Sequence, residues 1–597
     1  MVIDTSACKS ITAMFLQQAE RRGDRPFLWA KRNGAWTGQS WAEVKADVLA
    51  LGAGLRALGL KPGDRVMIVS ENRPEWAMAD LAIMAAGGIS VPAYVTNTSA
   101  DHLHILNNCG ARFVVTSTRA LTEKVLGAAA QTGCPPTIIA MDPPEVKQSN
   151  GPGLIAWADA VALGRGFEDQ LVETIEATGR GDTACIIYTS GTGGAPRGVM
   201  LSHGALLADC WGAWYLLESI ASDDEVFLSF LPLSHSYEHT VGLMFPISLG
   251  AQIYYAESID QLANNMAETH PTIMTAVPRL YESMRARILH GVSRKGGMTE
   301  KLFMLAVTLG AKRYTKGRLG PVDGLLDRVV DKLVRAKVRA RFGGRLKALV
   351  SGGAPLSYEV GLFFTALGVR ILQGYGQTEA GPAISCNPPT KIKIDSVGPP
   401  LAGIEVRMAE DGEILVRGEV VMQGYWNDPA GTAHAIRDGW LHTGDIGVMD
   451  ADGYIRITDR KKDIIVNSGG DNISPQRVEG FLTLQPEIAQ AMVMGDRRPH
   501  LVALLVPDAA WAEEWARAHG KSGDLAELLD DPDFRRAMGD AVERVNKTLS
   551  TMEKVRRTLL TPEGFTTENG MLTPTLKIRR HVIREKYGER LEGLYGG

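Results

Sequence analysis

Short apolar runs alternate with amphipathic helical patterns over about the first 380 residues of the 597-residue chain. Strand-like runs occupy residues 66–69, 113–115, 184–187, 253–255 and 349–350. A helix is expected from about Ser40, because apolar side chains recur there on one face and Ser40 with Glu43 forms a capping box. Alternation of strands and helices predicts an α/β fold with buried sheets.

The pattern changes over residues 396–458, where glycine turns separate short strands. Asp411-Gly412, between residues 404–406 and 414–416, is a hairpin signal, so this stretch predicts a small β-rich subdomain. A charged run at 459–463 marks a domain boundary. Beyond it, Ser474-Pro475 opens a helix and residues 501–506 read as a strand. We expect a large domain over residues 1–459 and a smaller one over 460–597.

The composition is ordinary for a soluble globular protein, with 45% hydrophobic residues and a net charge of −4. A charge so near balance implies no nucleic-acid partner. The six cysteines include no C-x-x-C pair, which fits a reducing compartment and argues against structural zinc. Neither a signal peptide nor a long apolar window is found, so we expect a cytoplasmic protein, with peripheral contact at the inner face of a membrane left open.

One segment departs from this balance, because residues 283–347 carry 17 Lys and Arg against four Asp and Glu. Apolar residues recur there at every fourth position: Val330, Val334, Val338 and Phe342. Basic residues surround them: Arg335, Lys337, Arg339 and Arg341. This basic amphipathic helix either packs on its own domain with a solvated face or contacts a membrane or an anionic ligand such as CoA.

The stretch from Tyr188 to His203 reads YTSGTGGAPRGVMLSH and follows the buried run 184–187. A glycine-rich loop lets backbone N–H groups and hydroxyls surround phosphate oxygens, and a cation adds charge. The candidate phosphate-binding residues are Thr189, Ser190, Gly191, Thr192, Gly193, Gly194 and Arg197. The spacing is not that of the common P-loop, and taken alone such a loop is also typical of a flexible turn.

The order of these residues resembles the phosphate loop of the adenylate-forming (AMP-binding) superfamily. Gly193 stands where that family usually has a threonine, and Arg197 where it has a lysine. Four further motifs match in the expected order and extend the resemblance over nearly the whole chain. The ending E-N-G-x-L-T-P-T-x-K and the basic insertion resemble the long-chain fatty-acyl-CoA synthetase branch. The resemblance implies a large domain of packed mixed sheets with helices, followed by a smaller, mobile α+β domain.

The nucleotide-binding residues follow from two motifs. In Ser351–Leu356, Gly353 and Ala354 form either a close approach to a nucleobase or an ordinary turn at a strand end. The second motif contributes Gln373, Gly374, Tyr375, Gly376, Thr378 and Glu379. The Tyr375 ring can lie against adenine, Thr378 can donate to a phosphate, and Glu379 is an oxygen ligand suited to Mg²⁺. The resemblance also puts Thr189 near the metal.

Further residues complete the expected site. The carboxylate of Asp445 can accept both ribose hydroxyls, and Arg460 resembles an arginine that contacts ribose and phosphates. The resemblance makes Lys462 part of a hinge and Gly469-Gly470 a loop that approaches the thiol donor. Lys577 resembles the catalytic lysine that bridges the acid and the α-phosphate. His235 is either a structural histidine or a substrate-positioning residue beside the acyl pocket.

The resemblance implies ATP-dependent activation of a long-chain fatty acid to an acyl-adenylate, then transfer to coenzyme A, releasing AMP and pyrophosphate. ATP, Mg²⁺ and CoA would serve the reaction. A fatty acyl-AMP ligase and a CoA ligase for another hydrophobic acid are the alternatives. Lys577 and Glu379 argue against a non-catalytic nucleotide-binding relative. The sequence leaves chain length and oligomeric state open.

Overall fold

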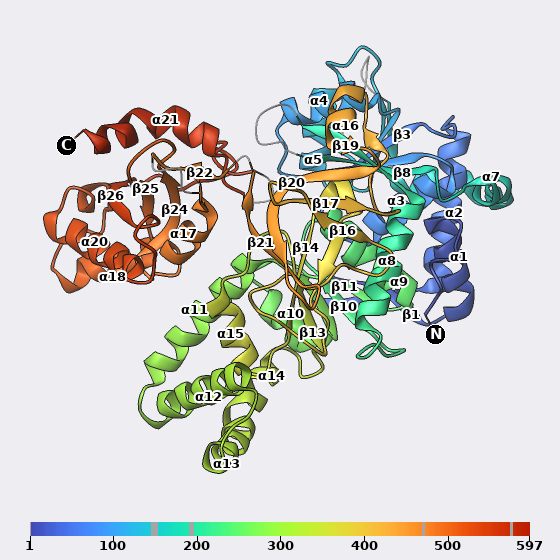
Figure 1. Ribbon diagram of the computed structural model, residues 1–597. Helices are drawn as coiled ribbons and strands as arrows, with labels where there is room; N and C mark the ends of the chain where they lie inside the picture. Colours follow the sequence, from blue (N-terminus) through green and yellow to red (C-terminus); the bar gives the residue numbers. More distant parts are fainter. Residues whose placement is uncertain are drawn as a thin grey trace.

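The computed structural model describes residues 2–144, 153–189, 196–461, 463–468, 472–573 and 577–596 (Figure 1). Ser190, Gly191, Thr192, Gly193, Gly194, Lys462, Gly469 and Gly470 lie outside these residues. The expected elements are found: Ser40 caps a helix, and its hydroxyl and backbone N–H both bond to Glu43, as the capping box predicts.

The large domain contains a mixed sheet that has eight strands within the described residues. Its strands are β1 (Pro26–Arg32), β2 (Ala35–Ser40), β10 (Val226–Ser229), β11 (Gln252–Tyr255), β12 (Ile273–Ala276), β13 (Ala348–Ser351), β14 (Ile371–Gly376) and β15 (Ala383–Cys386). Their order is β15-β14-β13-β12-β10-β11-β1-β2. The inner pairs are parallel, and only the two edge strands, β2 and β15, are antiparallel to their neighbours.

A second mixed sheet also has eight strands within the described ranges. They are β3 (Arg65–Val69), β4 (Ile89–Ala93), β5 (Phe113–Thr116), β6 (Thr137–Ala140), β7 (Leu154–Ala156), β8 (Thr183–Thr189), β9 (Arg197–Ser202) and β18 (Gly424–Tyr425). Their order is β18-β9-β8-β4-β3-β5-β6-β7, with β9 and β18 antiparallel to their neighbours. The strands expected at 66–69, 113–115 and 184–187 belong to this sheet.

Helices of the large domain cover and join the two sheets. They are α1 (Ile11–Arg22), α2 (Trp41–Ala57), α3 (Pro74–Ala85), α4 (Ser99–Cys109), α5 (Arg119–Ala129), α6 (Trp157–Gly164), α7 (Val172–Ala177), α8 (His203–Leu217), α9 (Phe245–Leu249), α10 (Leu262–Thr269) and α15 (Tyr358–Ala366). α3 is mostly apolar and almost wholly buried, and its cluster includes Ile68 of one sheet and Phe227 of the other. The main core therefore lies between the sheets.

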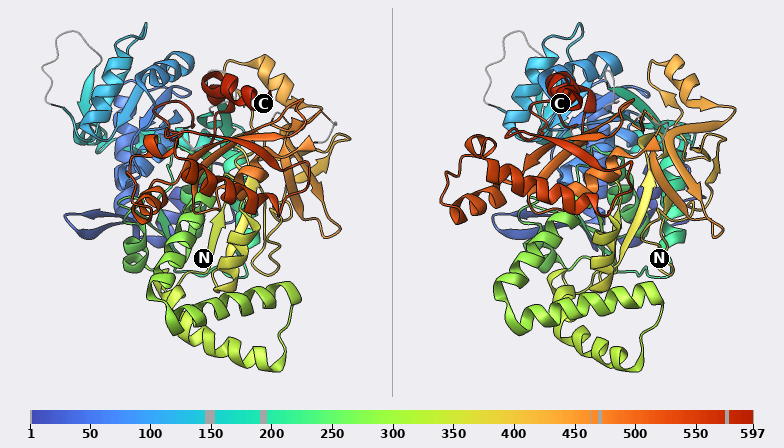
Figure 2. Two further views of the ribbon diagram at one scale, coloured as in Figure 1. Left: turned by 90° about the vertical axis from the view of Figure 1, so that its left-hand side faces the viewer. Right: turned by 60° about the vertical axis from the view of Figure 1, so that its left-hand side comes forward.

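The basic insertion is a helical hairpin that projects from the large domain, at the bottom of every view (Figures 1 and 2). It consists of α11 (Pro278–Lys295), α12 (Gly297–Lys316), α13 (Pro321–Val330), the π-helical turn η3 (Asp331–Arg335) and α14 (Ala336–Arg341). Val330 and Phe342 are buried and Val334 and Val338 pack against the cores, so this apolar face turns inward. Within the described residues, no helix combines the length and apolarity needed to cross a bilayer.

The expected β-rich subdomain follows. Its strands are β16 (Glu405–Met408), β17 (Glu413–Arg417), β19 (Ile436–Arg437), β20 (Trp440–Met449) and β21 (Ile455–Arg460), and α16 (Pro429–Ala435) lies beside them. β16 and β17 are antiparallel around Asp411-Gly412, as the hairpin signal predicts. Because β20 and β21 are also antiparallel, Asp445 pairs with Arg460 across the sheet.

The C-terminal part is α+β. Its strands are β22 (Ile465–Val466), β23 (Asn472–Ile473), β24 (Ile488–Met494), β25 (Leu501–Pro507) and β26 (Val555–Leu560). Its helices are α17 (Pro475–Leu482), α18 (Ala509–Ala518), α19 (Leu525–Leu528), α20 (Pro532–Asn546) and α21 (Arg580–Glu592). One face of the β24-β25-β26 sheet packs on α17, α18 and α20, and the other on α21.

Candidate active site

Two of the phosphate-loop candidates are among the described residues: Thr189 ends strand β8, and Arg197 begins strand β9. β8 and β9 are antiparallel, and Thr189 pairs in register with Arg197. The position of β8 is fixed because its side chains are mostly buried in the core. Its partner Arg197 therefore lies at the same end of the sheet as Thr189. The hairpin therefore brings the Thr189 hydroxyl and the Arg197 cation to one place.

Two residues that the sequence analysis missed hold Arg197. Its guanidinium lies 4.5 Å from the ring centroid of Tyr425 and 3.7 Å from the carboxylate of Asp428. The hydroxyl of Tyr425 in turn donates to Glu379 Oε1 at 2.9 Å. Tyr425 thus connects the phosphate-loop arginine to the candidate metal ligand. The signal in the sequence was weak, because an aromatic beside Gly424 in a two-residue strand has no periodicity to mark it.

The predicted ribose-binding residues form a second connected group. Asp445 is only 4% exposed, and its carboxylate accepts from the Tyr375 hydroxyl at 2.7 Å and from Arg460 Nε at 3.1 Å. The strand pairing of β20 with β21 brings the acid and the arginine together although 15 residues separate them. A buried carboxylate needs such partners, because an unpaired charge in the interior is costly.

Backbone packing explains the glycines on either side of Tyr375. A Cβ on Gly376 would lie 1.9 Å from the Pro382 carbonyl oxygen, and one on Gly374 would lie 3.0 Å from the Ser385 carbonyl oxygen. The close antiparallel approach of β15 therefore requires both glycines. The neighbouring Gln373 accepts the Asn387 N–H at its carbonyl, and its buried side-chain oxygen has no hydrogen-bond partner within the described residues.

The turn after β13 contains the other nucleobase candidates. Gly353 has a φ of +81°, a conformation that favours glycine, and both Gly353 and Ala354 are exposed. Behind them a Cβ on Gly352 would lie 3.1 Å from the Tyr237 ring, so the turn is packed on one side and open on the other. Either interpretation of this turn, nucleobase contact or strand end, is compatible with this geometry.

Thr378 and Glu379 lie in a short 3-10 turn directly after β14. The Thr378 hydroxyl lies 2.9 Å from that of Ser236, a third residue that the sequence analysis missed. No cluster of three His, Cys, Asp or Glu side chains able to hold a metal was found in the described ranges. Mg²⁺ commonly uses one or two carboxylates together with waters and substrate phosphates, and Glu379 fits that mode of binding.

Lys577 reaches this site from the C-terminal domain. Its backbone N–H donates to the Thr573 hydroxyl at 3.0 Å, and its carbonyl accepts the Thr573 N–H at 2.8 Å. The side chain retains contact with solvent, yet enough protein surrounds it that burial lowers its pKa to about 8. The charge of Arg460 contributes to this lowering of the pKa, whereas Asp445 and Glu379 oppose it. The lysine therefore interacts with three of the predicted nucleotide-site residues.

His235 lies close enough to Lys577 for the charge of the lysine to act on the imidazole. Burial, with a smaller contribution from the charge of Lys577, lowers its pKa to about 3, so the imidazole is neutral. Its Nδ1 accepts the Tyr237 N–H at 3.1 Å. A neutral imidazole that accepts at Nδ1 carries its proton on Nε2. His235 therefore offers an Nε2–H donor.

Comparison with known proteins agrees with this geometry. The AMP-binding enzyme family matches residues 15–426, and the AMP-binding enzyme C-terminal domain matches residues 462–597. The chain belongs to the AMP-binding enzyme family. This confirms the resemblance to the adenylate-forming superfamily and to its long-chain fatty-acyl-CoA synthetase branch.

Similar proteins of this family cover the whole chain. The long-chain-fatty-acid–CoA ligase FadD15 of Mycobacterium bovis is 34% identical over 98% of this chain and 97% of its own. The peroxisomal long chain acyl-CoA synthetase 6 of Arabidopsis thaliana is 31% identical over 94% of this chain and 82% of its own. The A domain of a carboxylic acid reductase from Segniliparus rugosus, solved with AMP and a co-purified carboxylic acid, has a TM-score of 0.74. It is 21% identical, over 98% of this chain and 94% of that one, and therefore shows the fold alone.

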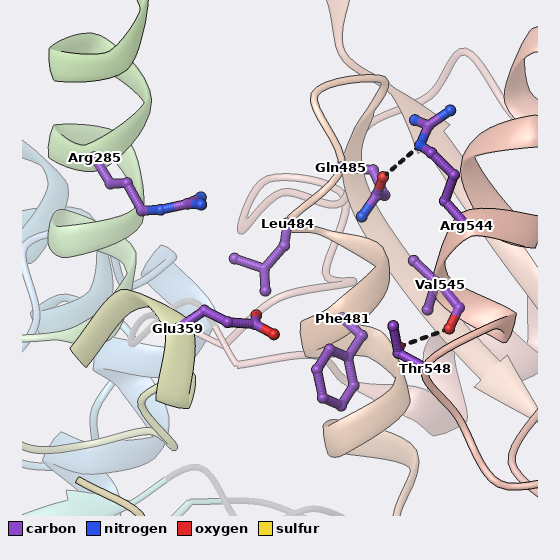
Figure 3. A pocket seen from close by; sticks show the side chains of 8 residues that line it. All are labelled: Arg285, Glu359, Phe481, Leu484, Gln485, Arg544, Val545 and Thr548. Carbon is purple, nitrogen blue, oxygen red and sulfur yellow. Dashed lines mark hydrogen bonds between the residues drawn. The ribbon is translucent and has the colours of Figure 1, made fainter. Parts of the chain in front are cut away.

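A cavity of about 200 Å³ in this AMP-binding enzyme lies between the two domains and contains none of the predicted site residues (Figure 3). Arg285 of α11 and Glu359 of α15 face Phe481 and Leu484 of the C-terminal domain across it. Leu484 also packs against the apolar cluster of the large domain that includes Phe364. The cavity therefore belongs to the domain contact that accompanies the present position of Lys577.

Proposed function

We propose that this AMP-binding enzyme is a long-chain-fatty-acid–CoA ligase. It activates the acid with ATP to an acyl-adenylate and then transfers the acyl group to coenzyme A. The observation that carries the proposal is the hydrogen-bonded group of Asp445, Tyr375 and Arg460 on strands β14, β20 and β21, in which the charges of Asp445 and Arg460 act on Lys577. The names of the full-length relatives, at 34% and 31% identity, support the choice of acid and of thiol.

In the first half-reaction a carboxylate oxygen attacks the α-phosphorus of ATP, the bond to the β-phosphate oxygen breaks, and pyrophosphate leaves. Both reactants are anions, so catalysis consists mainly of placing them together and neutralising charge. Lys577 supplies an ammonium group between the acid and the α-phosphate. Arg197 supplies a second cation beside the glycine-rich loop, and Asp445 with Tyr375 orients the nucleoside.

Magnesium would be held by Glu379, with the Thr189 and Thr378 hydroxyls nearby, and would neutralise phosphate charge when bound. His235 would position the acid, because its neutral ring presents an N–H donor without adding a charge that competes with Lys577. Gln373, Gly374, Gly376, Gly353 and Ala354 would form the wall against the base.

In the second half-reaction the thiol of CoA attacks the acyl carbon of the adenylate, and the bond to the phosphate oxygen breaks, so that AMP leaves and a thioester forms. We propose that the C-terminal domain turns about the 459–462 hinge, with Gly469 and Gly470 brought to the thiol. The contact at Leu484 would open as Lys577 withdraws. One site can then serve two reactions.

Pyrophosphate release against a panel of acids, with and without CoA, tests the proposal. Long-chain fatty acids are expected to give pyrophosphate, and CoA is expected to be consumed as a thioester. Adenylate that accumulates without a free thioester would instead identify a fatty acyl-AMP ligase. Turnover of aryl acids alone would identify a CoA ligase for another acid.

The proposal includes peripheral contact with a membrane, because a long-chain acid partitions into lipid. The basic helix expected to make this contact does not fit it as the sequence suggested. Arg335 is fully buried, and it donates hydrogen bonds to Asp327 and to the carbonyls of Ala306 and Ala366. Arg339 is paired with Asp331. Lys337 and Arg341 are exposed.

A further inference from the structure

Helix α13 carries ion pairs as well as apolar contacts on the side that meets α12. Asp323, Asp327 and Asp331 of η3 recur at every fourth residue, and Asp327 is buried together with Val330. Asp323 pairs with Lys312 of α12, and Asp327 with Arg313 of α12 and with Arg335. Ion pairs thus hold the inner face of the helix together with the apolar contact of Val330.

Other apolar residues of the same segment face outward. Val322 is 73% exposed and Leu325 is 64% exposed. The full set recurs with helical spacing: Val322, Leu325, Leu326, Val329 and Leu333. We call these five residues the α13 stripe. A contiguous exposed apolar surface of this kind marks an interaction site more often than single exposed residues do.

Basic residues flank the α13 stripe along the chain, from the end of α12 through α13 and η3 to α14. They are exposed, and none forms an ion pair with any described residue: Lys316, Arg318, Arg328, Lys332 and Lys337. The three aspartates of this segment are the acids nearest in sequence, and all are paired with Lys312, Arg313, Arg335 or Arg339. The surface around the stripe is therefore one of uncompensated positive charge.

We propose that the α13 stripe and its basic rim dock this enzyme on an anionic lipid surface. Apolar side chains would enter the interface while Lys and Arg meet lipid phosphates, as in helices that lie in the plane of a membrane. The choice of lipid as partner rests on the proposed function, whose substrate dissolves in bilayers. The positive rim supports it independently, because it is complementary to anionic headgroups.

The other occupants fit less well. A second copy that covered the stripe through a two-fold axis would bring the same basic rims against each other. CoA is disfavoured as well, because the hairpin projects from the large domain away from the strands β14, β20 and β21 that carry the nucleotide-site residues (Figures 1 and 2). A membrane meets such a projecting helix without obstruction from the rest of the chain.

Co-sedimentation with phosphatidylcholine–phosphatidylglycerol vesicles, and with phosphatidylcholine vesicles as the neutral comparison, tests the proposal. The full-length enzyme is expected to bind the anionic vesicles and to be released by salt. Val322→Ser/Leu325→Ser/Val329→Ser is expected to weaken the partition coefficient more than about tenfold, because three apolar side chains leave the interface. Arg328→Glu/Lys332→Glu should weaken it too and lower its salt dependence.

Matched variants separate the stripe from general surface effects. Leu163→Ser/Phe167→Ser/Val172→Ser removes apolar residues that are 47%, 54% and 49% exposed elsewhere, and binding should be unchanged. Lys61→Glu/Lys547→Glu is the charge control. Thermal unfolding and pyrophosphate release measured with detergent-dispersed acid should be the same for all variants, which shows that each folds.

Three results would overturn the docking proposal: wild type that ignores anionic vesicles, a stripe variant that binds like its control, or binding that salt does not change. A dimer that the stripe variant abolishes in sedimentation velocity would assign the face to a second copy instead. Vesicle binding by an enzyme that adenylates no long-chain acid would refute the proposed function and leave the docking surface standing.

Discussion

The proposed active site and the helical hairpin both bury a carboxylate against an arginine, but the two pairs differ in exposure. At the active site Asp445 is shared by Tyr375 and Arg460, and the Arg460 side chain is still 38% exposed. In the hairpin Arg335 is completely buried and divides its N–H groups among Asp327 and two backbone carbonyls. The first pair keeps a side open toward a ligand, and the second does not.

The difference shows that a local excess of basic residues in the sequence does not by itself identify a functional surface. The hairpin segment has a large excess of positive charge, yet its internal arginines stabilise helix packing, and the outer rim is the part left to meet a partner. The active site has few charges, and they come from residues scattered from 197 to 577. Function here follows from convergence in space more than from local density.

The largest expected effect comes from Arg335→Met, which leaves Asp327 with Arg313 as its one arginine and takes the donor away from the Ala306 and Ala366 carbonyls. Breaking such a pair costs about 3–5 kcal/mol, so we expect the hairpin to open at a much lower free energy. Hydrogen exchange in α12 and α13 measures this opening. The matched change Lys337→Met, at an exposed position, should alter exchange little. Equal protection in both variants would show that the buried pair does not hold the hairpin.

Lys577→Ala should do the reverse, with folding preserved and adenylation lost. A single oriented donor is worth roughly 3–4 kcal/mol of barrier. Pyrophosphate release is expected to fall accordingly, whereas thioester formation from added acyl-adenylate should continue. Pyrophosphate release near the wild-type rate would remove Lys577 from the mechanism.

The pKa of Lys577 gives the same comparison a pH dependence. Because its pKa is lowered to about 8, the ammonium form is present below that pH and is lost above it. The kcat/KM for adenylation should therefore fall as pH rises through about 8, since this ratio reports the free enzyme. Lys577→Arg should remove that decline, because arginine does not titrate in this range. His235, with a pKa of about 3, should add no step near neutrality.

Sequence patterns predicted local structure well and side-chain partners poorly. The capping box at Ser40, the hairpin at Asp411-Gly412 and the helix start at Ser474 depend on neighbouring residues, and all are present. The site motifs could be named because their residues stand close together in sequence. By contrast, Tyr425 meets Arg197 and Glu379 only through the strand pairing of β18 with β9. No local pattern contains that contact.

The hairpin shows the same limit from the other side. Helical spacing predicted that Val330, Val334, Val338 and Phe342 share a face, which is correct, but it could not say that Arg335 would be buried as well. Nor could it decide that the face containing Val322 and Leu325 would be left outside, because both faces of this segment have apolar residues at helical spacing. Burial depends on α12 and α15, which are packed there only in three dimensions.

Tyr425→Phe tests the connection inside the active site with a smaller expected effect. It removes the hydrogen bond to Glu379 and keeps the ring over Arg197. A hydrogen bond to a charged group contributes about 1.5 kcal/mol at the lower end of its range, which corresponds to about tenfold. We expect adenylation to need a higher Mg²⁺ concentration for half-maximal rate, and we expect calorimetry to show weaker binding of MgATP. Loss of ATP binding without Mg²⁺ as well would point to a structural defect instead.

The smallest effect is expected at Arg197, and it decides how the phosphate loop binds its ligand. The side chain is 44% exposed, so its charge is screened and contributes about 1 kcal/mol or less. Arg197→Lys keeps a cation that can lie over the Tyr425 ring and should retain most activity. Arg197→Ala should raise the KM for ATP about fivefold with little change in kcat. An alanine variant with unchanged ATP affinity would show that backbone groups of the loop suffice, and that Arg197 serves only to hold Tyr425 and Asp428 in place.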